Sequence, residues 1–220
     1  MKTFITLDNT KRRELPKNLQ SDDNRYPESL VEHFLELYTK PGDIVLDMFV
    51  GLGTTLFVAE EMGRIPYGIE YDEERYKYVR SHLVNKENLK HGDSRKLNTF
   101  NLPEIDFSIT SPPYMMKEHA ENPLTAYTQP GTYHRYLDEL QAAFTQLKPL
   151  LKRDAYVVVE VSNLRGNGVT MLAWDVGRAL SRVLRFEGEV VVGWRGEDKG
   201  EGTYGHGYDH SYCLVFTNSE

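Results

Sequence analysis

Four consecutive residues, Ser111, Pro112, Pro113 and Tyr114, have the groups needed to hold an amine carried by a flat ring. They follow the apolar run from Ile105 to Thr110, which is typical of a buried strand. The prolines fix two backbone φ angles, so the serine hydroxyl and a neighbouring carbonyl can accept hydrogen bonds from the amine. The tyrosine can stack on the ring face. A Pro-Pro turn that merely ends a strand is the alternative interpretation of so short a motif.

A glycine-containing turn follows another predicted strand, Ile44 to Asp47. Gly51 and Gly53 precede a helix predicted from about Thr54 to Met62. Glycines allow a ligand to approach the backbone, and a helix start offers unpaired N–H groups and a positive dipole end. A lone Gly-x-Gly is weak evidence, because the third glycine of the dinucleotide motif is missing. Its position between a strand and a helix nevertheless predicts a cofactor site.

Glu70 ends the next predicted strand, Tyr67 to Glu70, about twenty residues beyond the glycines. A carboxylate at this position accepts hydrogen bonds from ribose hydroxyls in sites of this type. The alternative is plain surface charge, because Asp72 and Glu73 are also acidic. The position at the strand end favours the ribose role.

The elements that must position these residues alternate along the chain as short β-rich runs and helical stretches, which indicates a sheet with crossover helices. The remaining predicted helices cover about 29–38, 72–83, 133–151 and 172–185, and the remaining strands cover about 89–93, 155–161, 188–194 and 210–216. The last two strands are predicted to form an antiparallel pair. The expected fold is α/β and Rossmann-like, with five parallel strands, a terminal antiparallel hairpin and ligands at the carboxyl ends of the strands.

Length and composition predict one globular domain over residues 1–220, with residues 1–24 as a loosely attached arm. Hydrophobic residues make up 40% and charged residues 27%, as in soluble proteins. We expect no membrane span, no signal peptide and a cytoplasmic location. The single cysteine, Cys213, excludes an intramolecular disulfide and a cysteine-based metal site, and no histidine spacing predicts a metal.

The formal net charge of -7 argues against binding nucleic acid through bulk electrostatic attraction. A local basic face is still open, and the helical spacing of Arg178, Arg182 and Arg185 is one candidate. Solvated surface charge is the alternative for each of these arginines.

The Ser-Pro-Pro-Tyr run resembles the fourth motif of the nucleic acid amino-methyltransferases, and its serine is typical of N4-cytosine DNA enzymes. The glycine turn resembles motif I of the same family, Asp-Pro-Phe-x-Gly-x-Gly-Thr-Thr. The matching residues are Asp47, Phe49, Gly51, Gly53, Thr54 and Thr55. Met48 and Leu52 depart from that pattern, which can alter the turn but removes no necessary backbone donor.

The resemblance implies a Rossmann-like methyltransferase fold, with S-adenosylmethionine as cofactor bound by the motif I residues and Glu70. It also implies that Asp93 meets the adenine amino group of the cofactor. Tyr26 and Pro27 resemble motif X, near the methionine end of the cofactor. For Asp93 the alternative is ordinary turn chemistry after Gly92, and for Tyr26 and Pro27 it is a plain helix start.

The implied function is that of a site-specific DNA methyltransferase (cytosine-N4-specific), with Ser111, Pro112, Pro113 and Tyr114 as catalytic residues. The motif order X, I, IV leaves adenine N6 or an RNA base open. A non-catalytic, cofactor-binding regulatory subunit is the alternative from another class. The chain has no segment of the size of a target-recognition domain, so loops, a dimer or a partner subunit would read the sequence. Aromatic residues of two loops and one strand flank the expected base pocket and are candidates for its wall: Tyr127, Tyr133, His134, Tyr204, His206, Tyr208, His210 and Trp194. Local packing is the alternative for each of them.

Overall fold

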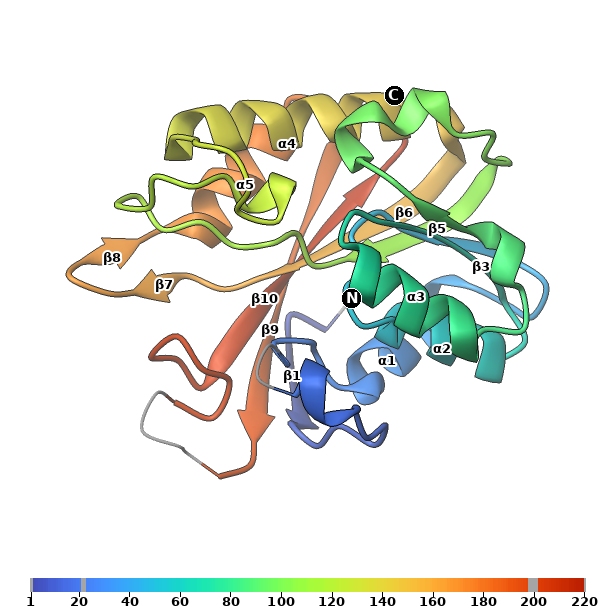
Figure 1. The fold of residues 1–220 in the computed structure, drawn as a ribbon, viewed down its shortest axis with the longest axis horizontal. Coiled ribbons are helices and arrows are strands. Elements are labelled where there is room, and N and C mark those ends of the chain that lie inside the picture. Colours follow the sequence, from blue (N-terminus) through green and yellow to red (C-terminus); the bar gives the residue numbers. More distant parts are fainter. Residues whose placement is uncertain (1, 21–22, 198–201, 220) are drawn as a thin grey trace.

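A central sheet of eight strands organises the computed structural model, which describes residues 2–20, 23–197 and 202–219. The strand order is β1-β9-β10-β6-β5-β2-β3-β4 (Figure 1). The strands are β1 (Phe4–Asp8), β2 (Ile44–Asp47), β3 (Ile65–Glu70), β4 (Leu89–His91), β5 (Ile105–Thr110), β6 (Leu151–Val161), β9 (Arg185–Arg195) and β10 (His210–Thr217). A separate small hairpin consists of β7 (Leu164–Arg165) and β8 (Val169–Thr170).

Strands β2 to β6 form a parallel group in the order β6-β5-β2-β3-β4, and β10 runs antiparallel to both β6 and β9. The predicted sheet of five parallel strands closed by an antiparallel pair is therefore confirmed. The carboxyl ends of the parallel strands share one edge, and the start of β10 lies at that edge because Tyr212 pairs with Val161 at the end of β6.

Helices cover both faces of the sheet. They are α1 (Glu28–Tyr38), α2 (Thr54–Glu61), α3 (Glu73–His82), α4 (Tyr133–Leu147) and α5 (Leu172–Leu180), with short 3-10 segments at Lys17–Leu19, Lys86–Asn88, Ser94–Thr99, Pro123–Thr125 and Lys148–Leu150. Figure 1 shows α4 and α5 on one side of the sheet and α1 to α3 on the other. Helix spacing explains the burial, since Leu30, Phe34 and Leu35 lie on one side of α1.

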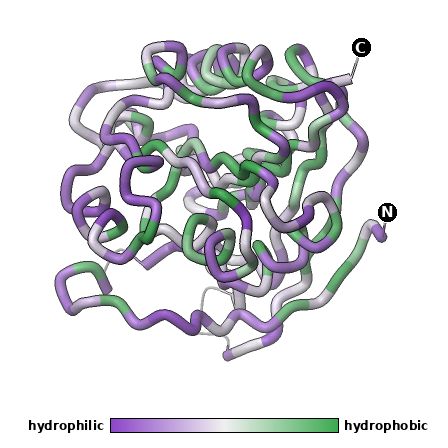
Figure 2. The backbone as a smooth tube through the Cα atoms, turned by 90° about the vertical axis from the view of Figure 1, so that its right-hand side faces the viewer, coloured by the Kyte–Doolittle hydropathy of each residue, from purple (hydrophilic) through white to green (hydrophobic). Residues whose placement is uncertain are grey.

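Two apolar cores follow from the alternation of side chains along the central strands. In β6, Val157 and Val159 pack with α4 and α5, whereas Val158 packs with α1 and α2. Figure 2 shows the hydrophobic segments running through the middle of the molecule. Among the described residues, no helix is both long and apolar enough to cross a membrane.

The N-terminal residues are better attached than the prediction of a loose arm over 1–24 implies. Strand β1 pairs in parallel with β9, with Phe4 opposite Val191. The backbone amides of Arg12 and Arg13 donate to the carboxylate of Glu28 at 2.9 and 3.1 Å. Strand β1 has only five residues, and its partner β9 is almost the whole chain away in the sequence. Its local sequence signal is therefore weak, which explains why the pairing was not predicted.

Several element ends differ from the predicted ones. Helix α5 ends at Leu180 rather than near Arg185, because Arg185 already begins β9. The predicted long loop over residues 115–132 contains a 3-10 turn at Pro123–Thr125. Of the predicted glycine-rich stretch between Gly196 and Gly207, residues 198–201 lie outside the described residues.

Candidate active site

The turn between β2 and α2 forms a backbone cradle at the carboxyl edge of the sheet. Gly51 and Gly53 have φ angles of +56° and +89°, a region that favours glycine. A Cβ at position 53 would lie 2.7 Å from the Phe57 ring and 2.9 Å from Val79, so no side chain fits there. A Cβ at position 51 would meet only the Phe49 carbonyl at 4.0 Å, which leaves room above the turn.

Glu70 holds this turn against the end of β3. Its Oε2 accepts a hydrogen bond from the Gly51 amide at 2.7 Å, and its Oε1 accepts one from the Asp72 amide at 2.8 Å. The side chain is buried, and this burial raises the pKa of Glu70 to about 7, although both amides act in the opposite direction. Each carboxylate oxygen retains a second lone pair for a ligand hydroxyl.

Asp47 joins the glycine turn to the Ser-Pro-Pro-Tyr run. Its Oδ1 accepts from Thr110 Oγ1 at 2.6 Å and from the Phe49 amide at 2.9 Å. The Tyr26 hydroxyl lies 3.5 Å from Asp47 Oδ2 and 2.5 Å from Thr55 Oγ1. Because Thr110 directly precedes Ser111, these contacts bring three of the motifs identified in the sequence to one place.

The remaining motif I and motif X residues lie in the elements around Asp47. Thr54 is the first residue of α2, and its buried Oγ1 has no hydrogen-bond partner among the described residues. Pro27 precedes the first residue of α1, and Phe49 is half-buried against the α4 and α5 core.

Glu160, near the end of β6, is buried next to the Ser-Pro-Pro-Tyr run and contacts its tyrosine. The Tyr114 hydroxyl donates to its Oε2 at 2.9 Å, and the Tyr204 hydroxyl donates to its Oε1 at 2.6 Å. The two hydroxyls lie 3.2 Å apart, and Ser111 Oγ lies 3.5 Å from the Tyr114 hydroxyl. Glu160 is fully buried, and this burial raises its pKa. Sequence analysis missed this residue, although a carboxylate within a run of valines was a usable signal.

Aromatic rings surround the same place. Trp194 stacks on Tyr204 with ring centroids 5.6 Å apart, and the His206 ring lies 5.6 Å from that of Tyr114. Of the aromatics expected here, Tyr133 instead donates to Asp175 from α4, and the exposed His134 lies beside Asp138 on the same helix. Residues near the start of β10 therefore contribute the ring contacts to Tyr114, whereas those at the start of α4 do not.

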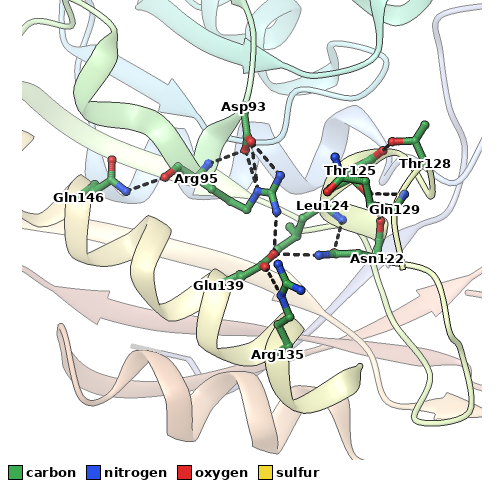
Figure 3. A network of polar contacts seen from close by, with 10 residues as sticks. All are labelled: Asp93, Arg95, Asn122, Leu124, Thr125, Thr128, Gln129, Arg135, Glu139 and Gln146. Atoms are coloured by element: carbon green, nitrogen blue, oxygen red, sulfur yellow. Dashed lines mark hydrogen bonds and ion pairs between the residues drawn. The ribbon is translucent and has the colours of Figure 1, made fainter. Parts of the chain in front are cut away.

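Asp93 belongs to a polar network that connects the end of β4 with α4 and the loop after β5 (Figure 3). The Arg95 guanidinium donates to both Asp93 oxygens and, at 2.8 Å, to Glu139 Oε2. Asn122 and Arg135 donate to Glu139 as well. The carboxylate predicted to meet the cofactor adenine thus already binds an arginine, which fixes its orientation.

A cleft of ≈920 Å³ opens along this network at the carboxyl ends of β3 and β4. Its lining residues are Tyr71, Glu73, His91, Gly92, Asp93, Arg95, Lys96, Gln129 and Glu139. Tyr71 directly follows Glu70, so the cleft begins where the glycine cradle ends. The spare lone pairs of Glu70 and the room above Gly51 fit a nucleoside-containing ligand that extends from the cleft to the cradle.

Comparison with known proteins relates the first third of the chain to one family. Residues 5–81 match the family model for N6/N4 methyltransferases, described as DNA methylase. The type II methyltransferase M.BglII of Bacillus subtilis is 46% identical over 50 residues, which are 23% of this chain and 14% of that protein. M2.DpnII of Streptococcus pneumoniae is 46% identical over 57 residues, which are 26% of this chain and 21% of that protein. The matched segments thus span less than a quarter of either relative.

Solved structures resemble the whole chain more broadly. TrmN from Thermus thermophilus has a TM-score of 0.62 and 19% identity, and the match covers 94% of this chain and 54% of that one. A TehB-like SAM-dependent methyltransferase from Corynebacterium glutamicum has a TM-score of 0.56 and 16% identity, and the match covers 91% and 92% of the two chains. At these identities the likeness concerns the fold, and the predicted Rossmann-like methyltransferase fold is confirmed.

The family match and the fold agree with the motifs read from the sequence. The prediction of S-adenosylmethionine as cofactor is confirmed at the level of this family and fold. Residues 5–81 are thus similar to the N4/N6 amino-methyltransferase family that the sequence motifs resemble.

Proposed function

We propose that this protein methylates the exocyclic amino group of a DNA base, with cytosine N4 as the favoured position. The observation that carries this proposal is the hydrogen bond of 2.6 Å between Thr110 and Asp47, because it joins the two halves of the site. The glycine cradle and the Ser-Pro-Pro-Tyr run meet through this contact at the carboxyl edge of the sheet.

The amino nitrogen of cytosine or adenine is a poor nucleophile, since its lone pair is delocalised into the ring. Ser111 Oγ and the Pro112 carbonyl are acceptors that can bind the amino hydrogens and so localise the lone pair on nitrogen. The two prolines fix the distance between these acceptors, which favours one orientation of the amine.

Tyr114 provides the ring on which the target base would stack. Its hydroxyl is tied to Glu160 and Tyr204, so the ring is held in place before the base arrives. A base within a duplex cannot reach a pocket at the edge of the sheet, so the base must be flipped out or come from a single strand.

S-adenosylmethionine, when bound, supplies a methyl group on a positively charged sulfur. The chain offers the Glu70 carboxylate for the ribose hydroxyls and the N-terminus of α2, which begins at Thr54, for the polar end of the cofactor. Asp93 and Tyr71 line the cleft where the adenine would lie. Asp47 fixes the turn rather than facing open space, because buried donors occupy its Oδ1.

Cofactor affinity is expected to rise with pH between about pH 6 and pH 8 because the pKa of Glu70 is raised to about 7. Ribose hydroxyls donate better to a carboxylate than to a carboxylic acid. Glu70→Gln should bind S-adenosylhomocysteine more weakly and lose this pH dependence, as titration calorimetry can measure. An affinity of the unchanged protein that stays flat across this range would contradict the assignment.

The same pKa shift affects stability in the absence of cofactor. The folded state holds the Glu70 proton more tightly than the unfolded chain, in which the pKa is near 4.5. The stability that Glu70 contributes is therefore lost as pH rises from 4.5 through about 7. Glu70→Gln should flatten this part of the pH–stability curve.

Cytosine and DNA are supported by different observations. The serine that begins the Ser-Pro-Pro-Tyr run favours cytosine N4, and the type II methyltransferases with similar segments favour DNA. We also propose that the loops of the chain, a dimer or a partner subunit provide target recognition.

The test is transfer of labelled methyl groups from S-adenosylmethionine to mixed DNA and RNA, followed by digestion and identification of the methylated nucleoside by mass. N4-methylcytosine in DNA that disappears with Ser111→Ala is the expected result. N6-methyladenine would overturn the cytosine assignment, and label only in RNA would overturn the DNA assignment. Cofactor binding without any transfer would favour a regulatory subunit.

A further inference from the structure

A row of aromatic side chains leads away from the candidate base pocket along β10. His210 and Tyr212 lie on the same side of β10, and Tyr208 lies in the turn just before that strand. The ring centroids of Tyr208 and His210 are 5.4 Å apart, and those of His210 and Tyr212 are 5.2 Å apart. Trp174 of α5 adds a fourth ring, 5.1 Å from Tyr212. We call these four residues the aromatic track.

The track lies next to the base pocket along the same segment of the chain. Ser211 and Cys213 alternate with the track residues, and Ser211 accepts from Trp194 Nε1 at 3.1 Å on the pocket side. His206 lies two residues before Tyr208, and its ring lies 5.6 Å from that of Tyr114. A nucleic acid strand whose target base enters the pocket beside Tyr114 can therefore extend from the pocket along the track.

Arginines lie near both ends of the track. The Arg165 guanidinium lies over the Tyr208 ring, with its carbon 4.7 Å from the centroid. Arg178 is exposed and follows Trp174 by one turn of α5. Neither arginine forms an ion pair within the described part of the chain. In a protein with a net charge of -7, two uncompensated cations beside a row of rings favour a polyanion that also has flat groups.

Exposed apolar side chains extend the same surface. Trp174 is 48% exposed, and the nearby Val169 and Met171 are 57% and 49% exposed. A tryptophan exposed to this degree covers little core and remains available for stacking. Aromatic side chains that stack on successive bases, with cations for the phosphates, are the means by which proteins bind single strands without reading sequence.

We propose that the aromatic track binds single-stranded nucleic acid next to the target base, with Arg165 and Arg178 on its phosphates. This inference rests on the proposed function and specifies its substrate class. Bases in an intact duplex stack on one another and leave no face for protein rings. The substrate is therefore a single strand, or a duplex opened over several nucleotides.

The chain allows a direct optical test, because it has only two tryptophans and Trp194 is buried. Mixed-sequence 20-nucleotide DNA and RNA single strands and a matched DNA duplex are titrated in the presence of S-adenosylhomocysteine. Single strands should quench tryptophan fluorescence, and the duplex should bind more weakly. Trp174→Phe should abolish the quenching but retain most of the affinity, which anisotropy of a labelled strand measures.

Substitutions that remove rings or charges should weaken single-strand binding. Trp174→Ala and Tyr208→Ala should each lower the affinity by about tenfold. Phe4→Ala, which removes an exposed ring on β1, is the matched control and should have no effect. Arg165→Ala should weaken binding and reduce its salt dependence, whereas the exposed Arg153 at the opposite end of β6 should tolerate alanine.

Equal affinity of Trp174→Ala and the unchanged protein for single strands would overturn the proposal, as would preferential binding of the duplex without quenching. The DNA and RNA arms identify which strand is preferred. Failure here is distinguishable from failure of the proposed function, because binding is measured without methyl transfer. An enzyme that methylates duplex DNA and is unaffected by Trp174→Ala would retain the proposed function and lose only this inference.

Discussion

Replacing Ser111 by alanine is expected to lower the rate constant for methyl transfer by about 10²–10³-fold, the usual loss when one well-placed polar group is removed from an active site. Cofactor affinity should change by less than about twofold, because the amides and carboxylates expected to hold the cofactor lie in other elements. The effect belongs to the chemical step rather than to folding, since Ser111 is only half-buried and its Oγ contact with the Tyr114 hydroxyl is long, 3.5 Å, although Ser111 also interacts with the Glu160 carboxylate.

Single-turnover transfer with saturating cofactor measures this rate constant, and calorimetry measures cofactor affinity. Ser81→Ala is the matched control, because Ser81 is exposed on α3 and far from the carboxyl edge of the sheet. A Ser111→Ala protein that transfers methyl groups at the normal rate would contradict the assignment of the acceptor. Parallel loss of cofactor binding would instead assign Ser111 to the cofactor site.

Replacing Glu160 by alanine is expected to destabilise the protein by about 2–5 kcal/mol, because each buried hydroxyl left without an acceptor costs about 1–3 kcal/mol. Tyr114 and Tyr204 would both lose their acceptor. Methyl transfer should also decrease, since the Tyr114 ring would no longer be fixed. Glu160→Gln keeps one carbonyl acceptor and should cost no more than about 1 kcal/mol.

Urea unfolding monitored by fluorescence gives these differences, with Glu104→Ala as the exposed control. Burial raises the pKa of Glu160 above the ordinary value of 4.5, so the folded state holds the proton more tightly than the unfolded chain. Its contribution to stability is therefore lost as pH rises from 4.5 toward the raised pKa. Glu160→Gln should remove that slope. An alanine variant as stable as the unchanged protein would show that Glu160 does not hold the two tyrosines.

Local signals predicted most of the fold. The valine-rich run of β6, the helix spacing of α1 and the glycines after β2 depend on neighbouring residues, which the sequence displays directly. Parallel strands have their carboxyl ends on one edge, so the meeting of the glycine turn with the Ser-Pro-Pro-Tyr run followed from the fold class. The motif pair and the resemblance to the amino-methyltransferase family could be read from the sequence alone.

The tertiary structure decided the contacts between distant residues. Glu160 accepts hydrogen bonds from Tyr114, which is 46 residues away in the sequence, and from Tyr204, which is 44 residues away. No local sequence pattern predicts these contacts. The parallel pairing of β1 with β9 likewise depends on strand order and register. The hydrogen bonds from Arg95 to Asp93 also became visible only in the structure. The sequence by itself determined which chemical groups this protein has and on which edge of the sheet they lie. Packing decided which of them touch, because side-chain contacts across a sheet depend on register and alternation rather than on neighbours in the chain.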